Sequence, residues 1–208
     1  IPEIAPLITS SSLSDIRSTF DELINSNTKK IEQLRTKIKK LKVLNKSLEE
    51  LSSNIGIYSF CVMPKCYRMM EQINADTESH KMGAAISSPM FTFGNIGYKT
   101  HFDDDHNPTQ RYMSFVIWEN LINTAPVDDN IENLPFVGPC ECISTISLGH
   151  GNGIIEFDLD GMIKHASSLG YGHLGYYYAF YIYAAPGGNS YGNGIVDYYK
   201  IYMPVKKQ

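Results

Sequence analysis

The feature that most constrains the fold is the uneven distribution of glycine and aromatic residues along the chain. All 16 glycines lie after residue 55, and Phe20 is the only aromatic residue before that point. A glycine-free stretch rich in Leu, Ile, Lys, Glu and Ser favours helix. A stretch rich in Tyr, Phe, Ile, Val and Gly favours strands. We therefore predict a boundary at residues 54–56, between an N-terminal helix and a β-rich domain.

Length and charge exclude several broad classes of protein. The chain has 208 residues, which is enough to bury a hydrophobic core. Its net charge of −4 argues against a dedicated nucleic-acid binder, so we predict no nucleic-acid partner. No apolar run approaches the ~18 residues of a membrane span, so we predict no membrane insertion.

The N-terminal part divides into a flexible leader over residues 1–12 and a helix over residues 13–55. Apolar residues recur in the helix at three- and four-residue steps, which places them on one narrow stripe with charged flanks. Such a stripe is typical of a coiled coil, which we expect to assemble a homotrimer, although its composition does not decide between two strands and three. The alternative is a helix that packs on its own domain. The predicted oligomerisation residues are Leu13, Ile16, Phe20, Leu23, Ile31, Leu34, Ile38, Leu41, Leu48 and Leu51.

Two asparagines interrupt this stripe. Asn27 and Asn45 fall on or near it, and the step from Asn27 to Ile31 is four residues where three is expected. Asparagine in such a seam weakens a coiled coil but specifies its register.

Residues 56–208 form the second domain, in which short apolar runs are separated by turn residues. The runs predict about eight strands with no clear amphipathic helix between them, and one short helix over 160–169. The predicted fold class is an all-β antiparallel sandwich of about eight strands, with a barrel as the alternative. The strands are expected at 57–63, 86–93, 98–102, 111–119, 142–148, 154–159, 176–184 and 195–205.

Three motifs of this chain resemble the TRAF family, in which a coiled coil carries a TRAF-C (MATH) β-sandwich. They are Ser88-Pro89-Met90-Phe91-Thr92, Gly97-Tyr98-Lys99 and Leu134-Pro135-Phe136. The resemblance implies a trimeric signalling adaptor that binds receptor peptides. However, Asp103-Asp104-Asp105 occupies the place where the family carries basic and aromatic residues, so the family's peptide site does not carry over.

We predict a binding protein rather than an enzyme, in which a coiled coil presents several heads that bind a protein, a peptide or a glycan with avidity. A TRAF-like adaptor would be cytoplasmic. The alternative function is an attachment head, extracellular or on a virion surface. The predicted ligand-binding residues are Tyr98, Asp103, Asp105, Tyr171, His173 and Tyr191.

Metal chemistry is the distant alternative. His101 and Asp103 alternate on a predicted strand, so both could face one metal ion as in a non-haem oxygenase, together with His150, His165 or His173. We nevertheless predict no metal and no cofactor.

The four cysteines leave the redox state open. The spacing of Cys61, Cys66, Cys140 and Cys142 departs from the usual zinc pattern. In an extracellular protein, Cys140 and Cys142 would form disulfides with Cys61 and Cys66, whereas in the cytosol all four would be free thiols.

Overall fold

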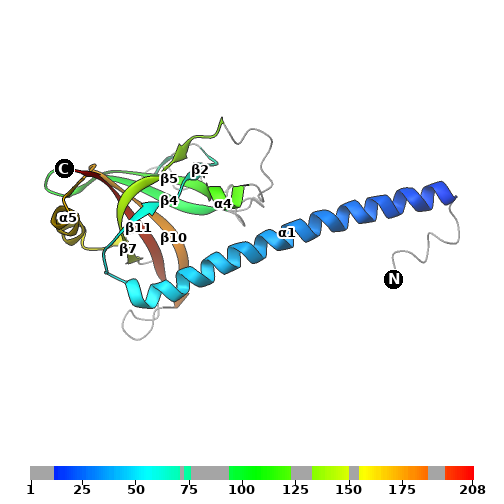
Figure 1. The fold of residues 1–208 in the computed structure, drawn as a ribbon, viewed down its shortest axis with the longest axis horizontal. Helices are drawn as coiled ribbons and strands as arrows, with labels where there is room; N and C mark the ends of the chain where they lie inside the picture. Colours follow the sequence, from blue (N-terminus) through cyan, green and yellow to red (C-terminus); the bar gives the residue numbers. More distant parts are fainter. Residues whose placement is uncertain (1–11, 71–72, 76–93, 123–132, 150–154, 187–194) are drawn as a thin grey trace.

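A long N-terminal helix leads into one curled antiparallel sheet (Figure 1). The computed structural model describes residues 12–70, 73–75, 94–122, 133–149, 155–186 and 195–208. The predicted leader, the predicted strand 86–93 and Tyr191 therefore lie outside the described residues.

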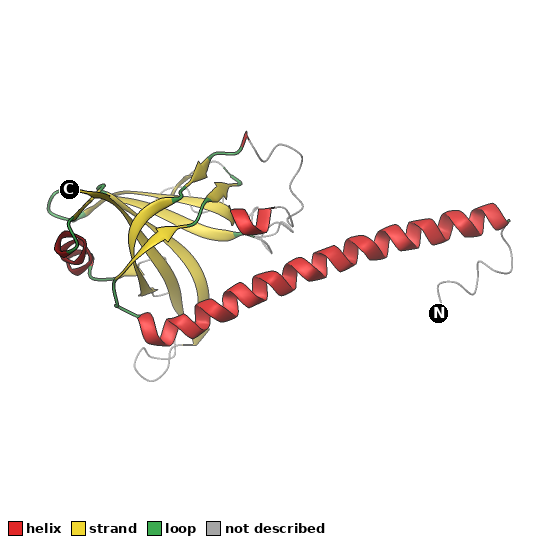
Figure 2. Cartoon of the chain, in the orientation of Figure 1, coloured by secondary structure: helices red, strands yellow, loops and turns green. Residues whose placement is uncertain are grey.

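The helix α1 spans Leu13–Asn54 and contains 42 residues, so it is about 63 Å long. Its start is specified by a capping box: the Ser12 hydroxyl accepts a hydrogen bond from the Asp15 amide, and the Asp15 carboxylate accepts one from the Ser12 amide. The chain leaves the helix through Gly56, whose φ of +71° favours glycine. The N-terminal half of α1 extends well beyond the sheet (Figures 1 and 2).

The strands join into a single hydrogen-bonded sheet in the order β1-β7-β11-β10-β4-β5-β2-β6. Three further strands pair with members of this path: β3 with β5, β8 with β7, and β9 with β11. Two shorter helices, α4 and α5, complete the described elements. The bounds are β1 Ser59–Met63, β2 Cys66–Arg68, β3 Ile73–Asn74, β4 Asn95–Phe102, β5 Pro108–Trp118, α4 Glu119–Ile122, β6 Phe136–Val137, β7 Cys140–Gly149, β8 Ile155–Glu156, α5 Leu159–Ser168, β9 Tyr171–His173, β10 Tyr176–Pro186 and β11 Ile195–Lys207.

The predicted β-sandwich is wrong. A sandwich needs two sheets packed face to face, whereas the described strands form one sheet that curls into a half-barrel. Most predicted strands lie close to observed ones, but a strand pattern does not specify which neighbour each strand bonds. The last two strands, β10 and β11, decide the outcome because they insert between β7 and β4 and join the two ends of the chain's β region.

Alternation along β10 separates the two faces of the sheet. Tyr177 and Ala179 pack on the outer face in a core that includes Met162 and Ala166 of α5. Tyr178 and Phe180 point to the inner face. Side chains of β5, β7, β10 and β11 line one cavity on that inner face, so the sheet curls around it.

Candidate ligand-binding pocket

A cavity of about 320 Å³ lies on the inner face of the curled sheet. It is closed by the segment between β1 and β2, by α4, and by one residue of α1, Lys40. Its lining combines a few charged groups with large apolar side chains. The described residues that line it are Lys40, Pro64, Lys65, Asn95, Trp118, Glu119, Asn120, Leu121, Ile146, Phe180, Tyr181, Ile182, Lys200 and Tyr202.

Aromatic rings from three strands form one wall of the cavity. The rings of Trp118 and Phe180 lie 4.7 Å apart between centroids at an angle of 58°. The ring of Tyr202 meets Phe180 edge-on at 5.9 Å. Behind them, Tyr178 stacks on Phe180 at 6.1 Å. This wall offers flat apolar surface that suits an aromatic molecule.

The glycine at position 97 makes room for this wall. Gly97 of β4 pairs with Phe180 of β10. A Cβ at residue 97 would lie 2.8 Å from the Phe180 ring, which is closer than van der Waals contact allows. The absence of a side chain therefore allows the Phe180 ring to lie against the backbone of β4.

Lysines of α1 connect the helix to the cavity. The Lys39 ammonium donates a hydrogen bond to the carbonyl of Asn120 in α4 at 2.6 Å. The next ammonium, that of Lys40, donates to the carbonyl of Gly94 at 3.2 Å. Burial lowers the pKa of Lys40, because the charged form is less well solvated there. The helix thus contributes a partly desolvated cation to the cavity.

The lining also carries an ion pair. Lys65 lies 3.7 Å from the carboxylate of Glu119. The same ammonium lies over the rings of Tyr67 and Phe136, at 4.5 Å and 4.4 Å from their centroids. Lys65 is therefore held in place by a carboxylate and two aromatic faces.

The four cysteines gather beside the cavity, and all are free thiols. Cys61 pairs with Cys142 across β1 and β7, and the sulfurs of Cys140 and Cys142 lie 3.6 Å apart. The hydrogen bond with Cys142 lowers the pKa of Cys140 to about 7, whereas burial raises that of Cys66 to about 12. The disulfides considered for an extracellular protein are absent from this structure.

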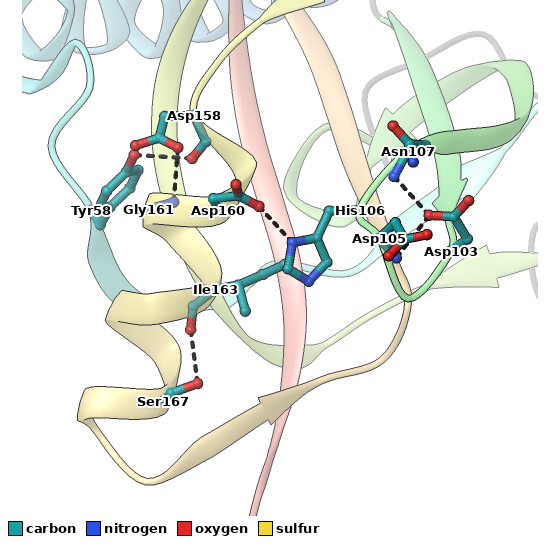
Figure 3. A network of polar contacts seen from close by, with 10 residues as sticks. All are labelled: Tyr58, Asp103, Asp105, His106, Asn107, Asp158, Asp160, Gly161, Ile163 and Ser167. Atoms are coloured by element: carbon teal, nitrogen blue, oxygen red, sulfur yellow. Dashed lines mark hydrogen bonds and ion pairs between the residues drawn. The ribbon is translucent and has the colours of Figure 1, made fainter.

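Two of the sequence-predicted ligand residues lie in a turn (Figure 3) and are not among the described residues that line the cavity. The carboxylate of Asp103 accepts hydrogen bonds from the amides of Asp105 and Asn107, at 3.1 Å and 2.8 Å, and so closes the turn between β4 and β5. The neighbouring His106 contacts Asp160 at the start of α5, with 2.5 Å between Nδ1 and Oδ1. Asp103 therefore has a structural role in this turn, and the Asp105 backbone takes part in the same hydrogen bonding.

The other predicted ligand residues are dispersed. The Tyr98 ring packs edge-on against Tyr199, with the Arg111 guanidinium 4.1 Å from its centroid. Tyr171 packs on Phe60, and His173 packs on Phe102. None of these three predicted residues lines the cavity.

The metal alternative gains no support. His101 lies against the ring of Tyr176, 5.5 Å between centroids, while the carboxylate of Asp103 is engaged in its turn. The described part of the chain contains no group of three or more His, Cys, Asp or Glu side chains that could hold a metal ion. His150, one of the three alternatives for the third ligand, lies outside it.

The residues that line the cavity are not among the predicted ligand residues. Their signal was present in two places: the single tryptophan on a strand with two apolar faces, and the alternation Tyr176, Tyr178, Phe180 along β10. Neither pattern indicates that β5 and β10 lie close together in the sheet. They do so because β4 alone separates them.

No protein-family model matches this sequence, and no curated protein matches it. Several solved structures resemble the fold at a distance. The C-terminal domain of EcmrR has a TM-score of 0.42 and 10% identity, covering 73% of this chain and 98% of that one. A hydrolase from Listeria innocua has a TM-score of 0.40 and 11% identity, covering 77% and 98%.

A third similar structure is EcmrR in complex with DNA, with a TM-score of 0.38 and 13% identity, covering 100% of this chain and 78% of that one. Likenesses this distant carry no argument about function. They include no TRAF protein, and the resemblance to that family stays a prediction. The absence of a nucleic-acid partner stays a prediction. None of the described helices is both long and apolar enough to cross a membrane.

Proposed function

We propose that this protein binds a small organic molecule in the cavity on the inner face of its sheet. The observation that carries the proposal is the wall of Trp118, Phe180 and Tyr202 around a cavity of about 320 Å³. Sites for small molecules are typically concave, mostly apolar, and about 300–1,000 Å³ in volume, with a few polar groups that orient the ligand. The cavity meets each of these criteria.

The helix α1 supports self-association as the second part of the proposal. Five of its apolar side chains are between 50% and 63% exposed: Ile24, Ile31, Leu34, Ile38 and Leu41. They follow steps of seven, three and four residues, which is the pattern of a coiled-coil seam. An exposed seam of this kind is stabilised when a second helix covers it.

The seam lies on the side of α1 that faces away from the sheet. Thr36 is 2% exposed and Leu51 is 6% exposed, so these residues mark the side covered by the rest of the chain. Residue 38 lies about 200° around the helix from residue 36 at ~100° per residue. The seam is therefore free for another molecule, whereas Leu51, predicted to join the oligomer, is buried within its own chain.

The apolar positions follow a regular heptad if Ile24, rather than Leu23, is assigned to the seam. Isoleucine then occupies the a positions 24, 31 and 38, and leucine occupies the d positions 34 and 41. The step from Asn27 to Ile31, treated as irregular in the sequence analysis, becomes an ordinary d-to-a step. Ile at a with Leu at d favours two parallel strands. We accordingly propose a dimer in place of the predicted trimer, while binding of a protein or peptide ligand stays a prediction.

The proposed ligand site is tested by titrating the full chain with 2-naphthamide, a neutral planar probe, using calorimetry. Trp118 is the only tryptophan in the sequence, so its fluorescence reports occupancy of the cavity directly. We expect saturable binding that shifts this fluorescence. The variant Phe180→Ala removes a wall of the cavity and should abolish binding.

The matched control is Tyr183→Ala, also on β10, whose ring is exposed and absent from the described lining. It should bind 2-naphthamide like the parent protein. Equal affinity of the Phe180→Ala variant, with its fold verified by circular dichroism, would place the probe elsewhere and overturn the proposal.

A further inference from the structure

We infer that the cavity selects an organic anion with an aromatic body, of the chemical class of the aromatic carboxylic acids. This inference rests on the proposed ligand-binding function and names the kind of ligand. The observation that carries it is the charge of the lining, taken together with its aromatic wall.

The lining is positively charged although the whole chain is negative. Its described residues include three lysines, Lys40, Lys65 and Lys200, and one carboxylate, Glu119. The net charge of the chain is −4. Lysines therefore outnumber carboxylates among the described lining residues, and the one described carboxylate, that of Glu119, pairs with Lys65. An excess of cations in one concave site attracts and orients an anion.

Lys200 is placed to meet a ligand that rests on the aromatic wall. It lies directly opposite Phe180 in the pairing of β11 with β10, and its side chain is half-buried. Within the part of the chain that the structure describes, no carboxylate pairs with Lys200. A ligand carboxylate would supply that missing charge where water is partly excluded, and such charge-assisted hydrogen bonds are among the strongest in proteins.

Lys40 adds a second cation from a different element. Its ammonium is partly desolvated at the edge of the cavity, where it bonds a backbone carbonyl. An anionic ligand at this edge of the cavity would contact α1 through Lys40.

The single carboxylate among the described lining residues does not favour a cationic ligand. Glu119 is more than half exposed, and Lys65 lies 3.7 Å from it. A ligand ammonium would have to displace Lys65 from Glu119 and approach two further lysines. We therefore expect the cavity to bind an aromatic anion more tightly than an aromatic cation.

The test uses three probes of nearly equal shape: 2-naphthoate, 2-naphthamide and 2-naphthylmethylammonium. Calorimetry on the full chain gives the three dissociation constants. We expect 2-naphthoate to bind roughly 10- to 150-fold more tightly than 2-naphthamide, since one charge-assisted hydrogen bond contributes roughly 1.5–3 kcal/mol. The amine should bind most weakly.

Two lysine variants and one control locate the effect. Lys200→Gln and Lys40→Gln should each weaken the binding of 2-naphthoate by a larger factor than the binding of 2-naphthamide. Lys164→Gln, at an exposed position of α5 on the outer face, should change neither.

The outcomes separate the inference from the function on which it rests. Binding of the amine or amide as tight as that of 2-naphthoate, or an unchanged 2-naphthoate affinity in Lys200→Gln, would overturn the anion selectivity and leave the cavity as a ligand site. Failure of all three probes to bind would overturn the ligand-binding function itself.

Discussion

The ring of Trp118 lies 4.7 Å from that of Phe180, although β4 separates their strands in the sheet. The two rings meet because Phe180 rests over Gly97 of β4, where no side chain intervenes. The contact joins the two halves of the β region and forms part of the aromatic wall of the cavity. We therefore expect ligand binding in the cavity to depend on how Phe180 packs against Gly97.

Replacing that glycine should affect stability and binding together. In Gly97→Ala the new methyl group would meet the Phe180 ring at 2.8 Å, so the ring must move toward the cavity. We expect a loss of about 1–3 kcal/mol in the free energy of unfolding, typical of overpacking, together with weaker binding of 2-naphthamide. Urea unfolding and calorimetry measure the two effects.

The matched control is Gly172→Ala on β9, where a Cβ would meet only the flexible Gln208 side chain. This variant should unfold and bind like the parent. If Gly97→Ala also unfolds and binds like the parent, the position of the Phe180 ring does not depend on the glycine at residue 97.

Self-association should depend on the exposed seam of α1. The double variant Ile31→Glu/Ile38→Glu places charges at two a positions and should convert a dimer into a monomer. Sedimentation equilibrium measures the mass directly. The control Lys30→Glu/Lys37→Glu introduces the same side chains at adjacent, exposed positions and should remain dimeric. A monomeric parent protein would contradict the proposed dimer, and a mass three times that of the chain would restore the predicted trimer.

Binding of an anion should weaken at alkaline pH. The ligand carboxylate interacts with the protonated form of Lys40, so affinity is retained below the pKa of this lysine and falls as pH rises through it. Because burial lowers that pKa from its usual 10.5, the fall should begin at a lower pH than for an exposed lysine. Calorimetry with 2-naphthoate across pH 7–10 measures the effect.

The variant Lys40→Arg provides the contrast, since arginine keeps its charge throughout this range. Its affinity for 2-naphthoate should stay nearly constant over the same pH interval. If the affinity for 2-naphthoate declines equally in the parent and the variant, the group that titrates is not Lys40.

Cys140 should react faster than Cys66. The hydrogen bond with Cys142 lowers the pKa of Cys140 and so favours its thiolate, whereas burial raises the pKa of Cys66 to about 12 and keeps it protonated. Brief treatment with iodoacetamide at pH 7.5, followed by peptide mass spectrometry, should find modification at Cys140 well before Cys66. In Cys142→Ala the hydrogen-bond donor is lost, so alkylation of Cys140 should slow. Faster modification of Cys66 than of Cys140 would contradict this order.

Several elements were predictable because their signals are local. The stripe of α1, the glycine that follows it and the alternation along β5 depend only on neighbouring residues, and the structure places α1 and β5 close to the predicted ranges. The short helix predicted over 160–169 is α5, Leu159–Ser168. Here Asp158 caps the first turn by accepting a hydrogen bond from the amide of Gly161.

The predicted ligand residues that the structure describes do not line the cavity, and the reason is related. Aspartates, histidines and tyrosines in glycine-rich segments are typical of binding loops, but Asp103 closes a turn and Tyr98 packs against Tyr199. The residues that do line a cavity, such as Trp118 and Phe180, resemble ordinary core residues in sequence. Only their contact across β4 in the folded sheet distinguishes them from ordinary core residues.

The sequence by itself determined where the helix begins and ends, where most strands lie, and that α1 carries an apolar stripe. These features arise from capping, periodicity and local propensity, which act over a few residues. The tertiary structure alone decided that the strands form one curled sheet, that Lys40 and Lys200 share a cavity, and which side of α1 is left exposed. These relationships join residues up to 160 positions apart, and they depend on which strands hydrogen-bond to which, a choice that no local pattern specifies.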